Sequence, residues 1–258
     1  MTPERRLAVV TGASRGIGRQ IALAMAAAGH DLVLASRSSA DLEAVAAECR
    51  MGGAETLIVP TDLRQPDQVD RLVAATAAFG PVSTLVNNSG IAGPSGLLWE
   101  LDQDDWEETM AVNVTAVFLT CRGFLPGMIE RGAGSIVNVG SITGKRPLLG
   151  RTPYATSKLA LVGLTRTLAL EVGQFGVRVN LVSPGFVEGT RIDWVIDRQS
   201  QTRGVEPSVV RSEFAGQSPL GRLTSPTEVA AAVVFLATDA ASGITGADLN
   251  VNAGVVMY

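Results

Sequence analysis

The chain has few of the side chains that bind metal ions or form covalent cross-links. Its 258 residues include two cysteines, Cys49 and Cys121, and one histidine, His30. The cysteines are 72 positions apart and form no Cys-x-x-Cys pair. His30 follows Gly29 where a helix is expected to turn into a strand, and we assign it no chemistry. We therefore expect neither a metal site nor a disulfide framework.

Charge is also scarce. Charged residues make up 18% of the chain, and 21 basic against 25 acidic residues leave a net charge of −4. The basic residues are scattered, whereas nucleic acid or an anionic lipid surface calls for a concentrated basic patch. We expect a small-molecule partner, and neither nucleic acid nor membrane. Because hydrophobic residues make up 46%, the chain can fold compactly.

Long apolar runs are missing as well. The charge-free span 72–99 is interrupted by prolines, glycines and asparagines, so it does not predict a membrane-spanning helix. Arg5 and Arg6 precede the apolar run 7–10 in the manner of a secretory signal, but the run is short and charge returns at Arg15. The run predicts a first strand, and we expect a cytoplasmic protein.

Short runs rich in valine, isoleucine and leucine alternate with longer segments of helical periodicity, which is typical of βαβ units. The predicted strands are 7–11, 31–36, 55–60, 83–87, 134–140, 177–182 and 247–251. The predicted helices lie near 16–29, 39–51, 66–78, 104–122, 153–172 and 226–238. Most strands are apolar on both faces, as parallel strands covered by helices are. The sequence predicts one α/β domain over residues 1–258, a doubly wound parallel sheet of about seven strands.

Residues 188–222 interrupt this alternation. They contain no predicted strand and two amphipathic runs, 191–201 and 207–216. Ligands of open α/β sheets bind beyond the carboxyl ends of the strands, and this segment follows the sixth strand. We expect a substrate lid, with Trp194 as a candidate for lining its pocket; the alternative is a surface helical hairpin.

A glycine-rich turn, TGASRGIG at 11–18, joins the first strand to the first helix. Gly12, Gly16 and Gly18 allow a tight turn and a close approach of the backbone to a pyrophosphate, which the helix N-terminus attracts. The spacing differs from the common G-x-G-x-x-G. Strand, turn and helix together nevertheless predict a dinucleotide site.

The end of the second strand predicts which dinucleotide binds. NAD usually meets an acidic side chain there, but the strand ends in Ser36 and Arg37, and Asp31 lies at its other end. Arg37 and Arg15 are suited to pair with a 2′-phosphate. We therefore favour NADP over NAD; the alternative is that Arg37 is a solvated loop charge.

Tyr154 and Lys158 are four residues apart on the helix predicted from residue 153. This spacing places both side chains on one face, about 6 Å apart along the axis. A neighbouring ammonium lowers the pKa of tyrosine, whose usual value of about 10 is high for acid–base chemistry at neutral pH. Ser141 follows the fifth strand, and Asn113 lies within helix 104–122, where its amide can hold a water.

Together these features resemble the short-chain dehydrogenase/reductase family, and the likeness spans essentially the whole chain. The motifs that carry it, in the family's order, are TGASRGIG at 11–18, Asp62, NNSG at 87–90, Asn113, Ser141, Tyr154-x-x-x-Lys158 and Pro184-Gly185. The resemblance implies a Rossmann-like fold and an oxidoreductase that passes hydride between a nicotinamide cofactor and a carbonyl or secondary alcohol.

The resemblance also implies roles for these residues. Tyr154 exchanges a proton with the substrate oxygen, Ser141 hydrogen-bonds that oxygen, and Lys158 holds the nicotinamide ribose while lowering the pKa of the tyrosine. Asn113 places a water that relays protons to Lys158. Asp62 contacts the adenine. The implied cofactor contacts are Gly12, Ser14, Arg15, Gly16, Ile17, Gly18, Arg37, Asp62, Leu63, Asn88, Gly90, Tyr154, Lys158, Pro184, Gly185 and Val187.

The chain departs from the family pattern at three places. The usual NNAG is NNSG, with Ser89 in place of alanine. The threonine expected five positions after the proline is Gly189, and Thr190 follows it, which puts the nicotinamide carboxamide contact in question. The sequence 252–254 reads Asn-Ala-Gly where Asp-Gly-Gly is usual.

We predict an NADP(H)-dependent oxidoreductase acting on a ketoacyl thioester or a small ketone. The alternatives are an NAD-dependent polyol or sugar dehydrogenase and a non-catalytic cofactor-binding sensor. The complete set of Ser141, Tyr154 and Lys158 argues against a sensor.

The loop between Ser141 and Tyr154 contains Lys145, Arg146 and Arg151. It suggests a substrate with a carboxylate, a phosphate or a phosphopantetheine thioester; the alternative is a solvated loop.

The helix after Tyr154 carries only Lys158 and Arg166 as charged residues up to position 170 and is apolar around most of its circumference. This exceeds the stripe that one sheet face buries. With the resemblance, it predicts a homotetramer that pairs this helix with its copy, and the apolar residues 255–257 are a candidate second interface.

Overall fold

The computed structural model describes residues 6–258. Seven parallel strands form one sheet in the order β3-β2-β1-β4-β5-β6-β7. The strands are β1 (Arg6–Thr11), β2 (His30–Ser36), β3 (Thr56–Pro60), β4 (Val82–Asn87), β5 (Gly134–Val139), β6 (Val177–Pro184) and β7 (Asp248–Val251). The predicted doubly wound sheet is confirmed, and each strand lies within two residues of its predicted bounds.

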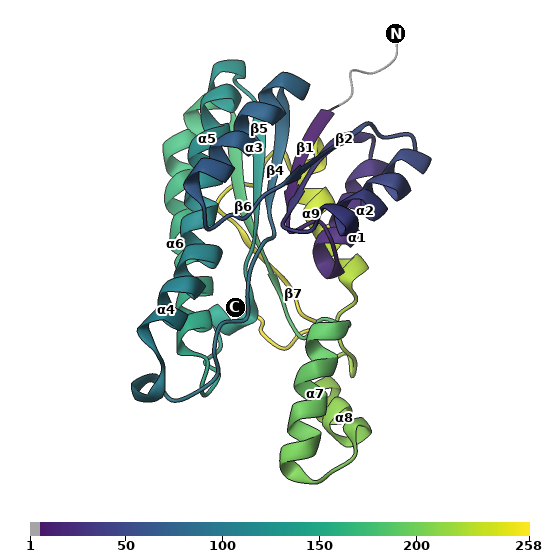
Figure 1. The fold of residues 1–258 in the computed structure, drawn as a ribbon, viewed down its shortest axis with the longest axis vertical. Helices are drawn as coiled ribbons and strands as arrows, with labels where there is room; N and C mark the ends of the chain where they lie inside the picture. The colour runs from purple at the N-terminus through teal and green to yellow at the C-terminus, as the bar shows by residue number, and fades with distance from the viewer. Residues whose placement is uncertain (1–5) are drawn as a thin grey trace.

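Helices cover both faces of the sheet (Figure 1). One apolar cluster joins the sheet to α1 (Gly16–Ala27), α2 (Ser39–Met51) and α9 (Pro226–Ala237). A second joins it to α3 (Pro66–Phe79), α5 (Ala116–Arg131) and α6 (Thr152–Val172). The strand order reverses between β1 and β4, which opens a crevice at the carboxyl ends of these strands.

The helix predicted at 104–122 is longer and less regular than the sequence indicates. It consists of α4 (Gln103–Met110), a π-helical turn (Ala111–Thr115) and α5, which continues past Pro126 to Arg131. Gly123 and Pro126, which would ordinarily end a helix, do not end this one. A Cβ on Gly123 would lie 2.5 Å from Val73 Cγ2, so this glycine lets α3 pack closely on α5. Burial of Phe124 and Met128 offsets the cost of a proline inside the helix.

The run Gln103–Arg131 is the one helix among residues 6–258 that is long and apolar enough to cross a membrane by length and composition alone. A helix that buries one side in a protein core passes the same test. Here α5 packs on β4, β5 and α3, with Val117, Thr120 and Cys121 buried. We therefore assign the run to the core.

Residues 188–222 form a helical hairpin of α7 (Thr190–Arg203) and α8 (Pro207–Gly216). It extends past the end of the sheet at which β6 ends (Figure 1). Its inner side is a separate small apolar cluster containing Ile192, Ile196, Val210 and Leu223. The rings of Phe186 and Phe214 meet edge to face there, with centroids 4.8 Å apart.

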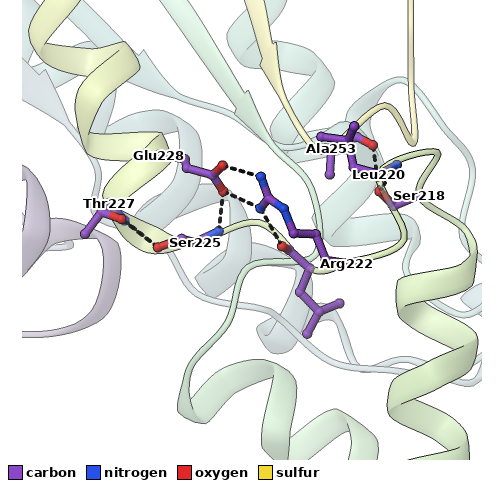
Figure 2. A network of polar contacts seen from close by, with 8 residues as sticks. Ser218, Leu220, Arg222, Ser225, Thr227, Glu228 and Ala253 are labelled. Carbon is purple, nitrogen blue, oxygen red and sulfur yellow. Dashed lines mark hydrogen bonds and ion pairs between the residues drawn. The ribbon is translucent and has the colours of Figure 1, made fainter.

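A polar network fastens the end of this hairpin to α9 and to the chain after β7 (Figure 2). Arg222 makes two hydrogen bonds to the Glu228 carboxylate, of 2.8 and 2.6 Å. Glu228 also accepts from the Ser225 backbone N–H and completes a capping box at the start of α9. Ser218 donates to the Ala253 carbonyl at 2.6 Å. The hairpin is therefore held at a fixed base.

Candidate active site

The glycine-rich turn lies at the mouth of the crevice, between β1 and α1. Gly12 has φ +64° and its N–H donates to the Ala35 carbonyl of β2, at 2.7 Å. A Cβ on Gly18 would lie 2.0 Å from the Gly12 carbonyl oxygen, so only glycine lets α1 begin against the turn. Gly16, at φ +55°, also needs a glycine conformation. The free N–H groups at the start of α1 form an anion site.

The other three residues predicted to contact the cofactor in the turn differ in their exposure and contacts. Arg15 is the exposed N-cap of α1 and has no capping side-chain hydrogen bond. Ser14 is half-buried. Ile17 packs against the apolar cluster under α1.

Asn88, after β4, is tied to the turn. Its Nδ2 donates to the carbonyl of Thr11 at 3.0 Å and to that of Gly12 at 3.2 Å. Thr11 Oγ1 accepts from the backbone N–H groups of Asn88 and Ser89. Asn88 thus fixes the glycine turn through its side chain, a positioning role that the sequence motif did not reveal.

Basic side chains surround the end of β2 and β3. Arg37 and Arg15 are exposed. Arg64, which the sequence analysis missed, donates to the Asp62 carboxylate at 2.6 Å. The Arg64 hydrogen bonds, with a smaller contribution from the charge of Arg37, hold the pKa of Asp62 below its usual range. The side chain of Leu63 is buried in the core, so only its backbone can face a cofactor.

The predicted cofactor residues at and after the end of β6 make packing and backbone contacts with neighbouring segments of the chain. A Cβ on Gly185 would lie 2.7 Å from Asn252 Cβ, so the glycine lets this loop approach the chain after β7. Pro184 ends β6. Val187 makes an isolated bridge with Thr224. Gly189, in the place of the expected threonine, has φ +128° as the N-cap of α7, a conformation that threonine rarely adopts.

Tyr154 and Lys158 lie one turn apart on α6, as predicted, with Lys158 Nζ 5.8 Å from the centroid of the Tyr154 ring. Lys158 is buried and donates to the Val139 carbonyl at 3.0 Å. Ser141 is the N-cap of the short 3-10 turn that follows β5. Its hydroxyl accepts from the Thr143 N–H at 3.1 Å and, as a hydrogen-bond partner of Tyr154, contributes to lowering the pKa of that phenol. The structure brings the three predicted side chains together.

The charges around Tyr154 change its proton affinity. Burial alone would raise the pKa of Tyr154, but the positive charges of Lys158, Arg191 and Arg151 and the Ser141 hydrogen bond outweigh it and lower the pKa. Burial and the charge of Arg191 lower the pKa of Lys158, although Tyr154 opposes this. Tyr154 is thereby a stronger acid than an ordinary tyrosine, which suits it to proton exchange.

Asn113 lies fully buried in the π-helical turn. Its Oδ1 accepts from the Ile91 N–H at 2.8 Å, and its Nδ2 donates to the Ile91 carbonyl and to Ser157 Oγ, each at 3.0 Å. Asn113 therefore fixes the loop after β4. At Gly90, a Cβ would lie 3.2 Å from Asn113 Oδ1 and 3.3 Å from Lys158 Nζ, so this loop passes directly beside both. The proton relay through a water stays a prediction.

Two arginines complete the site, and one of them was missed. Arg191, from α7, donates to the Gly90 carbonyl at 3.2 Å and so reaches across the crevice. Arg151 lies over the Tyr154 ring, its Cζ 5.3 Å from the centroid, and donates to Ser95 Oγ and to the Ala92 carbonyl. The position of Arg191 directly after Thr190 was the only signal available in the sequence.

The anion-binding role suggested for the loop after Ser141 is wrong for Lys145. This side chain is 12% exposed. Its ammonium forms an ion pair with the Asp248 carboxylate at 2.9 Å and donates a hydrogen bond to Asn250 Oδ1 at 2.5 Å. Its charge is therefore neutralised within the sheet edge. Arg151 is engaged as described, and Arg146 is exposed.

A cavity of about 190 Å³ lies between the turn that follows Ser141 and the helical hairpin. Its walls are partly apolar, with Ile142, Pro147, Leu148, Phe186 and Phe214, and partly polar. Trp194, the candidate for lining a pocket, is 60% exposed on α7 and does not line this cavity. Its lining includes Ile142 and Thr143, the two residues that follow Ser141 in the chain.

Comparisons with known proteins agree with this geometry. Residues 6–201 match the short chain dehydrogenase family. The chain is 37% identical over 256 residues to a Synechocystis protein named 3-oxoacyl-(acyl-carrier-protein) reductase, covering 98% of both chains. It is 36% identical over 258 residues to the Vibrio cholerae reductase of the same name, FabG, covering 100% of both.

Two solved structures are also similar. A variant of actinorhodin polyketide ketoreductase with NADPH superposes with a TM-score of 0.93 at 35% identity, over 98% of both chains. NAD⁺-bound xylitol dehydrogenase superposes with a TM-score of 0.90 at 29% identity, over 95% of this chain and 97% of that one.

Proposed function

Because the chain belongs to the short chain dehydrogenase family, we propose that it reduces the ketone of a 3-oxoacyl thioester or of a small ketone to a secondary alcohol. It is an NAD(P)-dependent oxidoreductase for which NADP(H) is favoured. The observation that carries the proposal is that Tyr154 and Lys158 lie on one face of α6 beside the end of β5, where Ser141 follows.

The residues present fit a dinucleotide. At Gly12 and Gly18 an added Cβ would clash with neighbouring atoms, and the exposed Arg15 and Arg37, at the turn and after β2, are suited to pair with a 2′-phosphate. NADPH supplies the hydride when it is bound. Gly90, Pro184 and Gly185 belong to the loops beside the nicotinamide half.

The chain's own residues move the proton and hold the substrate. Tyr154 donates its hydroxyl proton to the carbonyl oxygen as that oxygen becomes an alcohol, and the same group accepts the proton in the oxidative direction. Ser141 hydrogen-bonds the oxygen, which fixes the carbonyl against Tyr154. Lys158 stabilises the phenolate that forms, because its ammonium lies on the same helix face.

We place the rest of the substrate in the cavity beside Ser141, under residues 188–222, which act as a lid. The mixed lining of this cavity suits an acyl chain with a polar end. The fastened base at Arg222 and Glu228 leaves the tips of α7 and α8 as the part able to move. The buried, unpaired Cys49 and Cys121 suit a reducing compartment, so we place the protein in the cytoplasm.

A turnover screen tests this function. The purified protein is mixed with NADPH and a panel of 3-oxoacyl thioesters and small ketones, and with NAD⁺ and xylitol as the polyol arm, while nicotinamide absorbance is followed. We expect NADPH oxidation with at least one carbonyl compound. Turnover only with NAD⁺ and a polyol would replace the proposal by the dehydrogenase alternative, and no turnover in any arm would leave a cofactor-binding sensor.

We also propose a homotetramer that pairs α6 with its copy. Leu159 and Leu170 on α6 are 52% and 85% exposed, and Phe118 on the neighbouring α5 is 50% exposed. Such a set of large apolar side chains is typical of an interface. Of the other candidate interface, Met257 is exposed, but Val256 is buried within its own chain.

The tetramer predicts a specific effect of charge on α6. Leu164 and Leu168 pack on the sheet, so a charge there would also disturb folding. Leu170→Lys, at the exposed position, should convert a species of four times the chain mass into smaller species in sedimentation at micromolar concentration. Met51→Lys, equally exposed at the end of α2, is the control and should leave the assembly intact. A wild-type species of single-chain mass would contradict the proposal.

A further inference from the structure

Three positive side chains lie around Tyr154, and within residues 6–258 none of them has an acidic partner. In this part of the chain, the hydrogen bonds of Lys158, Arg151 and Arg191 go to neutral oxygens, those of Val139, Ala92, Ser95 and Gly90. No ion pair within residues 6–258 includes any of them. Two other arginines of the hairpin are neutralised: Arg203 pairs with Glu213, and Arg211 with Asp193.

The three charges lie around Gly90 and the Tyr154 ring. The Gly90 carbonyl accepts a hydrogen bond from Arg191. A Cβ added to Gly90 would lie 3.3 Å from Lys158 Nζ, so this ammonium lies beside the same residue. Arg151 stacks over the ring of Tyr154, 5.3 Å from its centroid. The charge of Arg191 lowers the pKa of Tyr154, of Lys158 and of Arg151. Arg191 therefore lies within electrostatic reach of all three.

A carbonyl compound needs only one proton donor here, which Tyr154 supplies. The surplus positive charge suits a negative group on the substrate close to the carbonyl, because a guanidinium binds a carboxylate through charge-assisted hydrogen bonds. Arg191 is exposed and has donors besides the one used on Gly90. A thioester presents no charge at this point.

We propose that Arg191 binds a free carboxylate of the substrate, so that an oxo acid or its hydroxy acid is preferred over the corresponding ester or thioester. The inference rests on the proposed function and narrows its substrate class. In the oxidative direction, the C–H hydride passes to NADP⁺ and the hydroxyl proton to Tyr154, while the carboxylate keeps its charge and is held by Arg191. The reaction itself is unchanged.

The test compares 3-hydroxybutyrate with its methyl ester, and acetoacetate with its methyl ester, at low salt. We expect kcat/KM about tenfold or more higher for the acid than for the ester, and a smaller ratio at high salt. Arg191→Met should lower kcat/KM about tenfold more for the acids than for the esters, because the esters lose only the effect of Arg191 on Tyr154 and the Gly90 loop. Arg211→Met, an exposed arginine on α8, is the matched control and should keep the wild-type ratio.

Each other outcome overturns the inference. Equal kcat/KM for acid and ester in the wild type removes the preference. Equal losses for both in Arg191→Met make Arg191 a positioning residue. A raised Kd for NADPH in this variant assigns the arginine to the cofactor's phosphates. Turnover of neutral ketones without any acid preference would sink this inference and leave the proposed function standing, whereas no turnover of any carbonyl compound would sink both.

Discussion

Replacing Tyr154 with phenylalanine is expected to lower turnover by about 10²- to 10⁴-fold while NADPH binding stays nearly unchanged. The substitution removes only the hydroxyl that, in the proposed function, exchanges a proton with the substrate oxygen. The ring, with Arg151 over it and Lys158 beside it, stays in place. The loss should therefore fall on kcat and hardly on cofactor affinity.

The measurements are kcat from nicotinamide absorbance and the NADPH Kd from fluorescence titration. The chain offers a matched control, because its other tyrosine, Tyr258, is 79% exposed at the C-terminus. Tyr258→Phe should keep wild-type turnover. If Tyr154→Phe retained activity within a few-fold of the wild type, another group would have to be the acid.

The pH dependence of the oxidation and reduction rates tests the role of Tyr154 independently. The pKa of Tyr154 lies below the ordinary tyrosine value, because the nearby positive charges favour the phenolate despite burial. Alcohol oxidation needs the phenolate and should rise with pH up to this lowered pKa. Ketone reduction needs the phenol and should fall as pH passes it. Neither limb should be seen in Tyr154→Phe.

Replacing Arg37 with alanine is expected to weaken NADPH binding by about 1.5 to 3 kcal/mol more than NADH binding, or about 10- to 150-fold in Kd. Only NADPH carries the 2′-phosphate that a guanidinium at the end of β2 would bind. The neighbouring Asp62 carboxylate is already paired with Arg64 at 2.6 Å. Arg37 is therefore available to the phosphate.

Titration of both cofactors into both proteins measures the effect. Arg71→Ala is the control, since Arg71 is an exposed arginine on α3 that pairs with Asp67, and it should leave both affinities as they are. Equal losses of NADPH and NADH in Arg37→Ala would show that Arg37 does not distinguish the phosphate, and NADP selectivity would then have to come from Arg15.

The sequence predicted the features that depend on local patterns. The strands were found because parallel strands buried on both faces are continuous apolar runs, such as 7–11 and 177–182. Gly12 and Gly18 were found because a turn of this shape has no room for a Cβ. Helical spacing predicted that Tyr154 and Lys158 share one face, and their position after Ser141 together with the family resemblance pointed to their role.

Features that depend on distant contacts were missed. No pattern in the loop near Lys145 indicates that β7 will supply Asp248 as its partner, 103 positions later. Arg191 meets Gly90 only after β4 and α7 are brought to one crevice. The continuation of α5 through Pro126 likewise depends on packing against α3 and the sheet. Tertiary contacts decided each of these against the local signal.

The separate apolar cluster of the hairpin has a consequence for how this protein can diversify. Ile192, Ile196, Val210 and Leu223 pack with one another rather than with either cluster of the sheet. Free-energy changes at sites without shared partners are close to additive. Substitutions inside the hairpin should therefore reshape the cavity proposed for the substrate with little effect on the glycine turn and on α6, which carries Tyr154. Evolution, or an engineer, can vary substrate choice here while the catalytic machinery is inherited intact.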